Sequence, residues 1–415
     1  MKNIVFLSHS DTLGGAAIVS YRLMCELRQM GYSVKMLVFN RNSDDPDVIA
    51  VGNGLSRRFA FMAERADIFF HNGFSRKNLF KVSTGGFGIN MRFNRYLEQA
   101  DVIMVNWINQ GLISLGGLRY LASTGKRIIW TMHDMWCMTG ICHHAYECER
   151  YKDMCGDCPF LGTNDRPDDL SHRVWLRKKN IYNKSKNIRF VAISSWQREK
   201  ARESSLLADM DVSLIPNAFP VDSFPYKPIR EGAFPGTKGF KNIITFGAAR
   251  LDDPVKGLQY AIDALNLLVL RAPEFAAKSV AVFFGNVRNP HIFEDLRFPH
   301  IHVGTINDPV ALQQLYATSK IVLSTSLYET LPGTIIEGMS CGAVPVAFGR
   351  GGQTDIIDHE ETGYVAEYLD CDDVANGILW AASAGIRRDR LHKVVVDKFS
   401  ANAIARRYLT LIDRE

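Results

Sequence analysis

Two glutamates, Glu329 and Glu337, lie on either side of a Pro-Gly turn. One apolar run ends before Glu329 and another begins after Gly342, which predicts a strand, a turn, a short helix and a strand. We expect Glu329 in the turn and Glu337 in the first turn of the helix, near the strand end where open α/β sheets bind ligands. Carboxylates that accept hydroxyl hydrogen bonds, beside helix N–H groups that suit a phosphate, favour a sugar nucleotide.

The same segment has a purely structural interpretation. Thr334 and Glu337 have the spacing of a capping box, in which the threonine caps the helix and the glutamate reaches back. Glu329 would then be a solvated loop residue. The segment alone leaves both interpretations open.

The elements that must position these residues follow a regular alternation of short apolar runs and amphipathic stretches. Helices are expected at 16–30 and 258–270, and strand–helix alternation throughout indicates an α/β fold with parallel sheets. We expect two doubly wound, Rossmann-like domains joined by a Pro- and Gly-rich linker at 219–241. The predicted strands are 3–8, 33–39, 102–106, 127–132 and 189–193, then 242–246, 280–284, 301–303, 321–324 and 344–347.

Composition excludes several classes of protein. The chain has 415 residues, is 47% hydrophobic and carries a net charge of +5. This charge is too small to indicate a nucleic-acid partner, but it suits phosphate or anionic lipid. No apolar run is long enough for a membrane span, and the first residues do not resemble a signal peptide. We therefore expect a cytoplasmic protein with reduced or metal-bound cysteines.

Two cations precede the predicted helix at 258. A helix N-terminus carries partial positive charge, so Arg250 and Lys256 are unfavourable there unless an anion lies between them. A donor phosphate could be that anion. Asp252 and Asp253 could supply it instead, as a surface ion pair.

The start of the chain offers two further candidates. Gly14 and Gly15 follow the first strand and let the backbone approach a ligand closely. They match neither the GxGxxG nor the GxxxxGK[ST] phosphate loop. His133 ends a strand and should face the ligand crevice, although it could also be a structural residue bonded to Asp134.

Five of the eight cysteines fall within residues 137–158. A tetrahedral thiolate set could bind a structural zinc that pins this long loop. The alternatives are free thiols or a disulfide pair. The proposed ligands are Cys142, Cys148, Cys155 and Cys158.

Residues 55–97 carry eight Lys or Arg, two acids and nine aromatic residues. This pattern suits an interfacial surface on anionic lipid. It also suits a core helix with a solvated basic face.

The segment from Tyr328 to Val346 resembles the E-x7-E signature of GT4-type retaining glycosyltransferases, which have the GT-B fold and include enzymes of bacterial surface-glycan assembly. Similar pieces stand in the same order along nearly the whole chain. Asp355 stands where the family usually has glutamate, and Thr330-Leu331 is poorer in glycine than the family's turn. The other pieces are Gly14-Gly15, His133-Asp134, Ile215-Pro-Asn217, Arg250 with Lys256-Gly257, Gly351–Ile356 and Thr362–Val365.

The resemblance implies a role for each candidate residue. Arg250 and Lys256 would bind the donor diphosphate, Glu337 the ribose, and Glu329 the transferred sugar. His133 would contact the sugar near the reacting carbon, and Gly14 and Gly15 would shape the place where donor and acceptor meet. The backbone of Leu331, Pro332, Gly333 and Thr334 would also hold the sugar.

The resemblance also implies the reaction and the organisation. We expect transfer of a hexose-type sugar, with retention and no metal cofactor, from a nucleoside-diphosphate sugar to a glycan or lipid-linked acceptor. Residues 1–218 would form the acceptor-side domain and 219–399 the nucleotide-sugar domain, facing a cleft, with the helix at 400–415 packing back on the first. The inner face of the cytoplasmic membrane is a further expected location. A sugar-nucleotide epimerase and a non-catalytic sugar- or partner-binding protein remain the alternatives.

Overall fold

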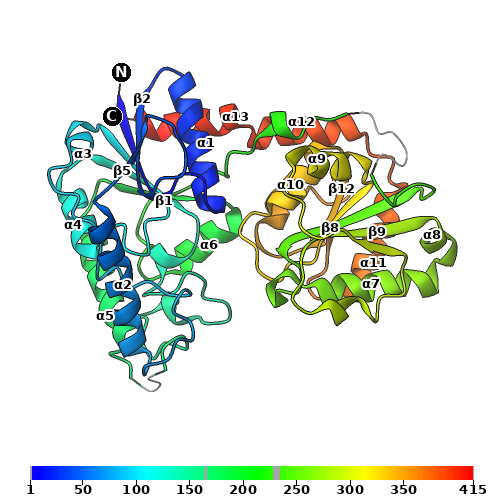
Figure 1. The fold of residues 1–415 in the computed structure, drawn as a ribbon, viewed down its shortest axis with the longest axis horizontal. Helices are drawn as coiled ribbons and strands as arrows, with labels where there is room; N and C mark the ends of the chain where they lie inside the picture. Colours follow the sequence, from blue (N-terminus) through cyan, green and yellow to red (C-terminus); the bar gives the residue numbers. More distant parts are fainter. Residues whose placement is uncertain (1, 163–165, 228–233, 415) are drawn as a thin grey trace. The chain divides into compact units, whose positions relative to one another are not determined.

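The computed structural model describes residues 2–162, 166–227 and 234–414. The chain divides into two compact units (Figure 1). The first comprises Met1–Ala218 and Ile404–Glu415, and the second comprises Phe219–Ala403. Residues 228–233 of the predicted linker lie outside the described residues.

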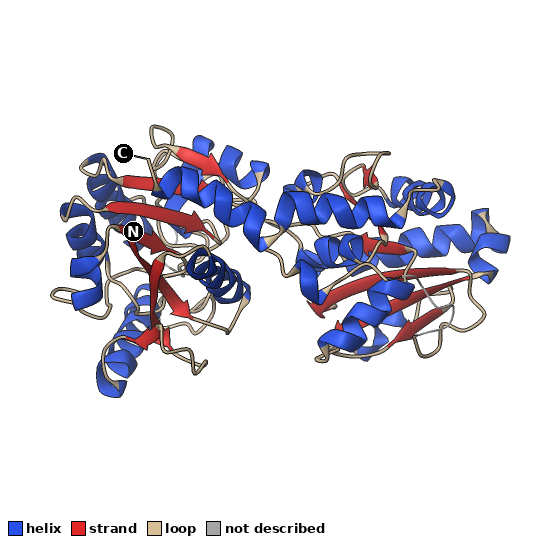
Figure 2. Cartoon of the chain, turned by 90° about the horizontal axis from the view of Figure 1, so that it is seen from above, coloured by secondary structure: helices blue, strands red, loops and turns tan. Residues whose placement is uncertain are grey.

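In its described residues, the first unit has a seven-stranded parallel sheet with the order β3-β2-β1-β4-β5-β6-β7. Its helices cover both faces of the sheet (Figure 2). The strands are β1 (Asn3–Ser10), β2 (Ser33–Asn40), β3 (Val48–Ala50), β4 (Val102–Val105), β5 (Arg127–Met132), β6 (Ile188–Ala192) and β7 (Val212–Leu214). The helices are α1 (Gly15–Gln29), α2 (Gly54–His71), α3 (Arg95–Gln99), α4 (Leu115–Ser123), α5 (Leu170–Asn183) and α6 (Ser195–Glu203).

The second unit has, in its described residues, a six-stranded parallel sheet with the order β10-β9-β8-β11-β12-β13. The strands are β8 (Asn242–Arg250), β9 (Ser279–Asn286), β10 (His300–His302), β11 (Ile321–Ser324), β12 (Val344–Phe348) and β13 (Tyr364–Ala366). The helices are α7 (Leu258–Arg271), α8 (Pro273–Ala277), α9 (Pro309–Thr318), α10 (Gly333–Ser340), α11 (Cys371–Ser383) and α12 (Arg388–Phe399).

The central strands are short apolar runs because helices cover both of their faces. Every residue of β4, β11 and β12 is buried. The strand order reverses between β1 and β4 in the first sheet, and between β8 and β11 in the second. Loops leaving the carboxyl ends of such neighbouring strands diverge and leave room for a ligand. Each unit therefore has one favoured edge for a site.

The last helix, α13 (Ala401–Ile412), returns to the first unit (Figure 1). The Tyr408 hydroxyl lies 2.8 Å from Oγ1 of Thr131 on β5. Lys2 donates to the Ile412 carbonyl (2.7 Å), and Arg127 donates to the Leu411 and Ile412 carbonyls (3.0 and 2.8 Å). These cations satisfy carbonyls that the helix end leaves without internal partners.

The prediction of two doubly wound parallel-sheet domains is confirmed. The bounds of β5 and β11 agree with the prediction, and most other strand ends differ by one or two residues. The prediction missed β3, β7 and β13, which have three residues each and are too short to show a period. Among the described residues, no helix is long and apolar enough to cross a membrane.

Candidate active site

Lys256 and Glu329 meet at the reversal point of the second sheet. Lys256 ends a short 3-10 helix, Pro254–Lys256, that follows β8, and Glu329 lies in the loop after β11. Nζ of Lys256 donates to Oε2 of Glu329 at 2.6 Å. Both side chains are partly accessible to solvent. The pair therefore places a cation and a carboxylate at the edge where this type of sheet binds ligands.

Glu337 is held by a buried tyrosine. The Tyr316 hydroxyl donates to Oε2 of Glu337 at 2.9 Å. Burial, and then the nearby charge of Glu337, raise the pKa of Tyr316, so its hydroxyl stays a neutral donor. Glu337 is the fifth residue of α10, so its expected place in the first helical turn is wrong.

The capping-box interpretation of this helix is also wrong. Pro332 is the N-cap residue, and no side chain caps the helix. Thr334 lies inside the helix, because the chain enters helical geometry at Gly333. The first N–H groups of α10 thus lack a side-chain cap, as an anion-binding helix start requires.

Two glycines let the loop after β12 pack tightly against the Glu329 turn. A Cβ on Gly351, which has φ +74°, would lie 2.3 Å from the Glu329 carbonyl oxygen. A Cβ on Gly352 would lie 1.8 Å from the Thr330 carbonyl oxygen. Gly352 also donates its N–H to the Glu329 carbonyl at 3.0 Å. Residues larger than glycine would therefore displace Glu329.

Gln353 fixes the same two loops from within, a role that the sequence analysis missed. It is fully buried, and its Oε1 accepts from the Ser324 hydroxyl at 2.8 Å. Its Nε2 donates to three carbonyls, those of Ser326, Phe348 and Arg350. Its position inside the Gly351–Ile356 motif is the sequence signal that could have pointed to it.

Arg250 has nearby carboxylates of its own. Its guanidinium lies 3.0 Å from Asp253 and 3.5 Å from Asp252. The surface ion pair considered as an alternative is therefore present for Arg250, whereas Lys256 pairs with Glu329.

Gly257, with φ +63°, has no room for a Cβ, which would lie 2.0 Å from the Thr325 carbonyl oxygen. This close approach brings the start of α7 against the loop after β11.

The first unit has a cavity of about 420 Å³ at the carboxyl ends of β1, β4 and β5. Gly14, Gly15 and His133 all line it, as expected for residues at that sheet edge. Gly14 has φ +92°, and a Cβ on either glycine would meet no atom within 4 Å. The glycines therefore keep the cavity wall open beside the first turn of α1.

His133 is neutral at physiological pH. Burial lowers its pKa from 6.5 to about 4, only partly opposed by the charge of Asp134. Its Nε2 lies 3.3 Å from Oδ1 of Asn106 and 3.5 Å from the Ser20 hydroxyl. The alternative of a hydrogen bond to Asp134 does not occur. His133 can thus exchange hydrogen bonds with a ligand but carries no charge.

Asp134 instead organises the cavity wall. One oxygen accepts from His143 Nδ1 (2.6 Å) and Trp107 Nε1 (2.7 Å), and the other accepts from the Trp136 N–H (2.8 Å). Burial raises the pKa of Asp134, but the His143 imidazole and the Trp136 N–H outweigh this effect and hold the pKa below its usual value. His143 and Trp107 both line the cavity and were missed by the sequence analysis, because neither belongs to a motif.

The cysteine cluster gathers around a small cavity of about 20 Å³, which Cys142, Cys148, Cys155 and Cys158 all line. In the described part of the chain, however, no group of three or more His, Cys, Asp or Glu side chains is arranged to hold a metal ion. The thiols are free, and burial raises the pKa of Cys155 to about 11 and that of Cys158 to about 12. Cys155 also accepts the Gly140 N–H at 3.1 Å. The four cysteines thus line one cavity without forming such a group, and the structural zinc stays a prediction.

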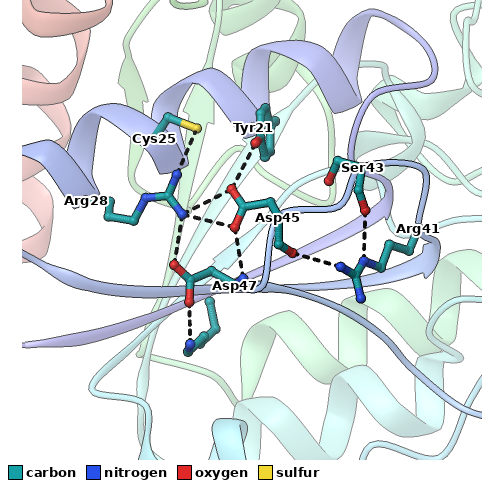
Figure 3. A network of polar contacts seen from close by, with 8 residues as sticks. Tyr21, Cys25, Arg28, Arg41, Ser43, Asp45 and Asp47 are labelled. Carbon is teal, nitrogen blue, oxygen red and sulfur yellow. Dashed lines mark hydrogen bonds and ion pairs between the residues drawn. The ribbon is translucent and has the colours of Figure 1, made fainter.

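The Asp45-Pro46-Asp47 segment, whose DxD spacing could suggest a metal site, is occupied by cations (Figure 3). Nη1 of Arg28 donates to Asp45 at 3.0 Å and to Asp47 at 2.8 Å. Lys35 also pairs with Asp47, and the Tyr21 hydroxyl donates to Asp45 at 2.9 Å. These carboxylates tie α1 to β2 and the β2–β3 loop.

Comparison with known proteins finds a family match within the second unit. Residues 241–384 match the family model of glycosyl transferases group 1. The N-acetyl-alpha-D-glucosaminyl L-malate synthase of Bacillus anthracis is 30% identical over 154 residues, which are 36% of this chain and 37% of that protein. An uncharacterized glycosyltransferase of Methanocaldococcus jannaschii is 29% identical over 161 residues, which are 36% of this chain and 40% of the relative. The matches thus span about two fifths of the length of these relatives.

Solved structures resemble the whole chain. Anabaena HepE in complex with UDP and glucose has a TM-score of 0.60 at 14% identity, with both chains covered completely. Sucrose-phosphate synthase from Thermosynechococcus elongatus has a TM-score of 0.61 at 17% identity, covering 100% of this chain and 98% of the other. A Rickettsia africae glycosyltransferase has a TM-score of 0.65 at 15% identity, covering 99% and 98%. The chain therefore has the GT-B fold, and residues 241–384 of its second unit are similar to glycosyl transferases group 1.

Proposed function

We propose that this protein is a retaining glycosyltransferase of the GT4 type. It transfers a hexose-type sugar from a nucleoside-diphosphate sugar to a glycan or lipid-linked acceptor in polysaccharide biosynthesis. The observation that carries the proposal is the Lys256–Glu329 pair, which lies at the sheet reversal point of the glycosyltransferase domain. The UDP and UDP-glucose complexes of HepE support a nucleotide-sugar donor.

In this proposal the second unit binds the donor. Breaking the bond between sugar and diphosphate leaves negative charge on the phosphate, which preorganised cations and N–H groups can stabilise. Lys256, Arg250 and the first N–H groups of α10 supply these, so the chemistry needs no metal ion. The Leu331–Thr334 backbone and Glu329 hold the sugar, and Glu337, fixed by Tyr316, accepts hydrogen bonds from the ribose hydroxyls.

Donor binding then changes the partners of two ion pairs. Lys256 then forms its ion pair with the diphosphate instead of with Glu329. The Glu329 carboxylate is left to accept a hydrogen bond from a sugar hydroxyl. Arg250 likewise shares its charge between Asp253 and the donor. The acceptor attacks from the side that the leaving phosphate occupies, and a phosphate oxygen takes its proton, which gives retention.

In this proposal the first unit binds the acceptor. The cavity beside Gly14 and Gly15 is wide enough for a sugar ring, and Trp107 in its wall offers an aromatic surface. Neutral His133 exchanges a hydrogen bond near the reacting carbon. A lipid-linked acceptor would place the enzyme at the inner face of the cytoplasmic membrane.

A donor panel tests the proposal. The protein is first heated with UDP, GDP, ADP and their sugars, and one nucleotide series should raise the melting temperature by mass action. Release of free nucleoside diphosphate is then measured with and without glycan acceptors. We expect sustained release only with an acceptor. If no nucleotide stabilises the protein, or if the sugar is epimerised without an acceptor, the proposal is wrong.

A further inference from the structure

Large apolar side chains on and after α2 point into solvent instead of the core. Six of them expose between 57% (Met62) and 82% (Leu55) of their surface. Together they are called the aromatic face: Leu55, Phe59, Met62, Phe70, Phe74 and Phe80. Leaving so much apolar surface in water is unfavourable, and a contiguous patch of this kind marks an interaction site.

The aromatic face is distinct from the side of α2 that belongs to the core. Leu55, Phe59, Met62 and Phe70 follow a helical period and so share one side of the helix. Ala60 and Ile68, on the other side, are buried. A core helix with a merely basic outer surface, the alternative left open by the sequence, therefore does not describe α2.

Ring contacts join α2 to the loop that follows it at two places, one on its exposed side and one on its flank. The rings of Phe70 and Phe74 lie 5.5 Å apart, and those of Phe61 and Phe80 lie 6.5 Å apart. The Arg65 guanidinium lies 5.3 Å from the Phe80 ring. The loop is also anchored to α2, because Oε1 of Glu64 accepts the N–H groups of Thr84 and Gly85 at 3.1 Å each. Phe74 and Phe80 are thus held near α2.

The charges around the aromatic face are almost all positive. Arg58, Arg76, Lys77 and Lys81 are exposed. The only two acids between residues 55 and 97 already have partners, since Glu64 pairs with Arg65 and Asp67 lies 3.2 Å from the imidazole of His71. Apolar side chains among cations complement a bilayer whose headgroups are anionic.

We propose that the aromatic face docks on an anionic lipid bilayer, with the apolar side chains entering the interface and the cations binding headgroups. This inference rests on the proposed function, because it gives a lipid-linked acceptor a route to the enzyme. Phe80 and Lys81 also line the cavity beside Gly14 and His133. The loop after α2 therefore links the docking surface to the acceptor cavity of the same unit.

Vesicle co-sedimentation at low salt tests the inference. The full chain should sediment with phosphatidylglycerol vesicles and remain in solution with pure phosphatidylcholine. Phe70→Ser/Phe74→Ser and Arg76→Glu/Lys77→Glu should each weaken binding by about tenfold or more. Leu270→Ser/Arg202→Glu is the matched control, since both residues are exposed and lie elsewhere, and it should bind like the wild type.

Two outcomes overturn the inference: no binding of the wild type to anionic vesicles, or equal binding by the double variants. The inference would also be wrong if the wild type dimerised without binding vesicles and the Phe70→Ser/Phe74→Ser variant did not dimerise. The aromatic face would then be the interface with a second copy of the chain. The nucleotide-induced shift in melting temperature, measured on the same samples, keeps the two proposals apart. A normal shift without vesicle binding rejects only the docking surface.

Discussion

Nζ of Lys256 lies 2.6 Å from Oε2 of Glu329, although the two residues are 73 positions apart in sequence. A lysine just before α7 faces the partial positive charge of that helix start. The Glu329 carboxylate offsets this repulsion, and a diphosphate can do the same. Under the proposed function, the pair is a resting arrangement that donor binding replaces, and this makes opposite predictions for its two members.

Removing the cation should weaken donor binding. In Lys256→Ala the diphosphate loses a charge-assisted hydrogen bond, so we expect the Kd for the nucleoside diphosphate to rise by roughly 10- to 100-fold. Isothermal titration calorimetry measures this. Arg387→Ala, which removes another cation of the second unit from an exposed ion pair with Asp389, should bind normally. An unchanged Kd for Lys256→Ala would place the diphosphate elsewhere.

Neutralising the Glu329 carboxylate should not weaken nucleotide binding. Glu329→Gln releases Lys256 from its ion pair, so the affinity for nucleoside diphosphate should stay the same or increase. The sugar loses its charged acceptor, and kcat should fall by roughly 100-fold. Parallel measurement of the nucleotide Kd and of kcat separates these effects. Loss of nucleotide affinity together with normal turnover would contradict the role given to Glu329.

Tyr316 should act through Glu337. Tyr316→Phe removes the hydroxyl that holds this carboxylate, so nucleotide affinity should drop several-fold and stability by about 1 kcal/mol. The matched control is Tyr364→Phe, which removes a tyrosine–carboxylate hydrogen bond to Asp373 in the same unit. Denaturant titration should show a similar loss for both variants, whereas only Tyr316→Phe should weaken nucleotide binding. Equal affinities would make Tyr316 purely structural.

His133 should make the protein sensitive to acid. Its pKa is about 4 in the folded state and near 6.5 when unfolded, so the unfolded chain binds the proton more tightly. Stability from this source is unaffected above about pH 6.5 and falls as the pH drops toward 4. His133→Gln should therefore lose less unfolding free energy between about pH 7.5 and 5 than the wild type.

Urea titrations of the wild type and His133→Gln at the two pH values measure this difference. Identical pH dependence in His133→Gln and the wild type would show that His133 titrates normally.

Lys178 should support the wall behind the cavity. It is completely buried, and its ammonium donates to the carbonyls of Trp136, Thr139 and Gly140 at 2.5 to 3.1 Å. Lys178→Met leaves these acceptors unsatisfied, so unfolding free energy should fall by on the order of 3 kcal/mol. Exposed Lys184→Met should cost almost nothing. A neutral effect of Lys178→Met would mean that water replaces the ammonium.

The sequence predicted the sheets because their strands are continuous apolar runs, and for β5 and β11 it predicted both ends. It predicted the region of the site because residues after neighbouring parallel strands must lie at one edge. It could not predict which side chains pair. Lys256 meets Glu329, and Tyr316 meets Glu337, through side-chain directions that only the packed structure determines.

Interpretations of short sequence patterns were incomplete or wrong where contacts with distant residues determine the structure. The capping-box spacing of Thr334 and Glu337 was misleading, because the helix begins before Thr334 and Tyr316 holds the glutamate. Cysteine spacing predicted the gathering of four thiols at one cavity, but spacing does not specify the distances that a metal requires. Asp134 was considered only as a partner of His133, since nothing in the sequence places His143 and Trp107 beside it.

The most direct test of the account is transfer of a radiolabelled sugar from the donor that stabilises the protein, measured for the wild type and Glu329→Gln with saturating donor and acceptor. The account predicts an acceptor-linked labelled product from the wild type and a loss of roughly 100-fold in the variant, with nucleotide binding intact. Equal product from both proteins, or none from the wild type with any donor that binds, would contradict it.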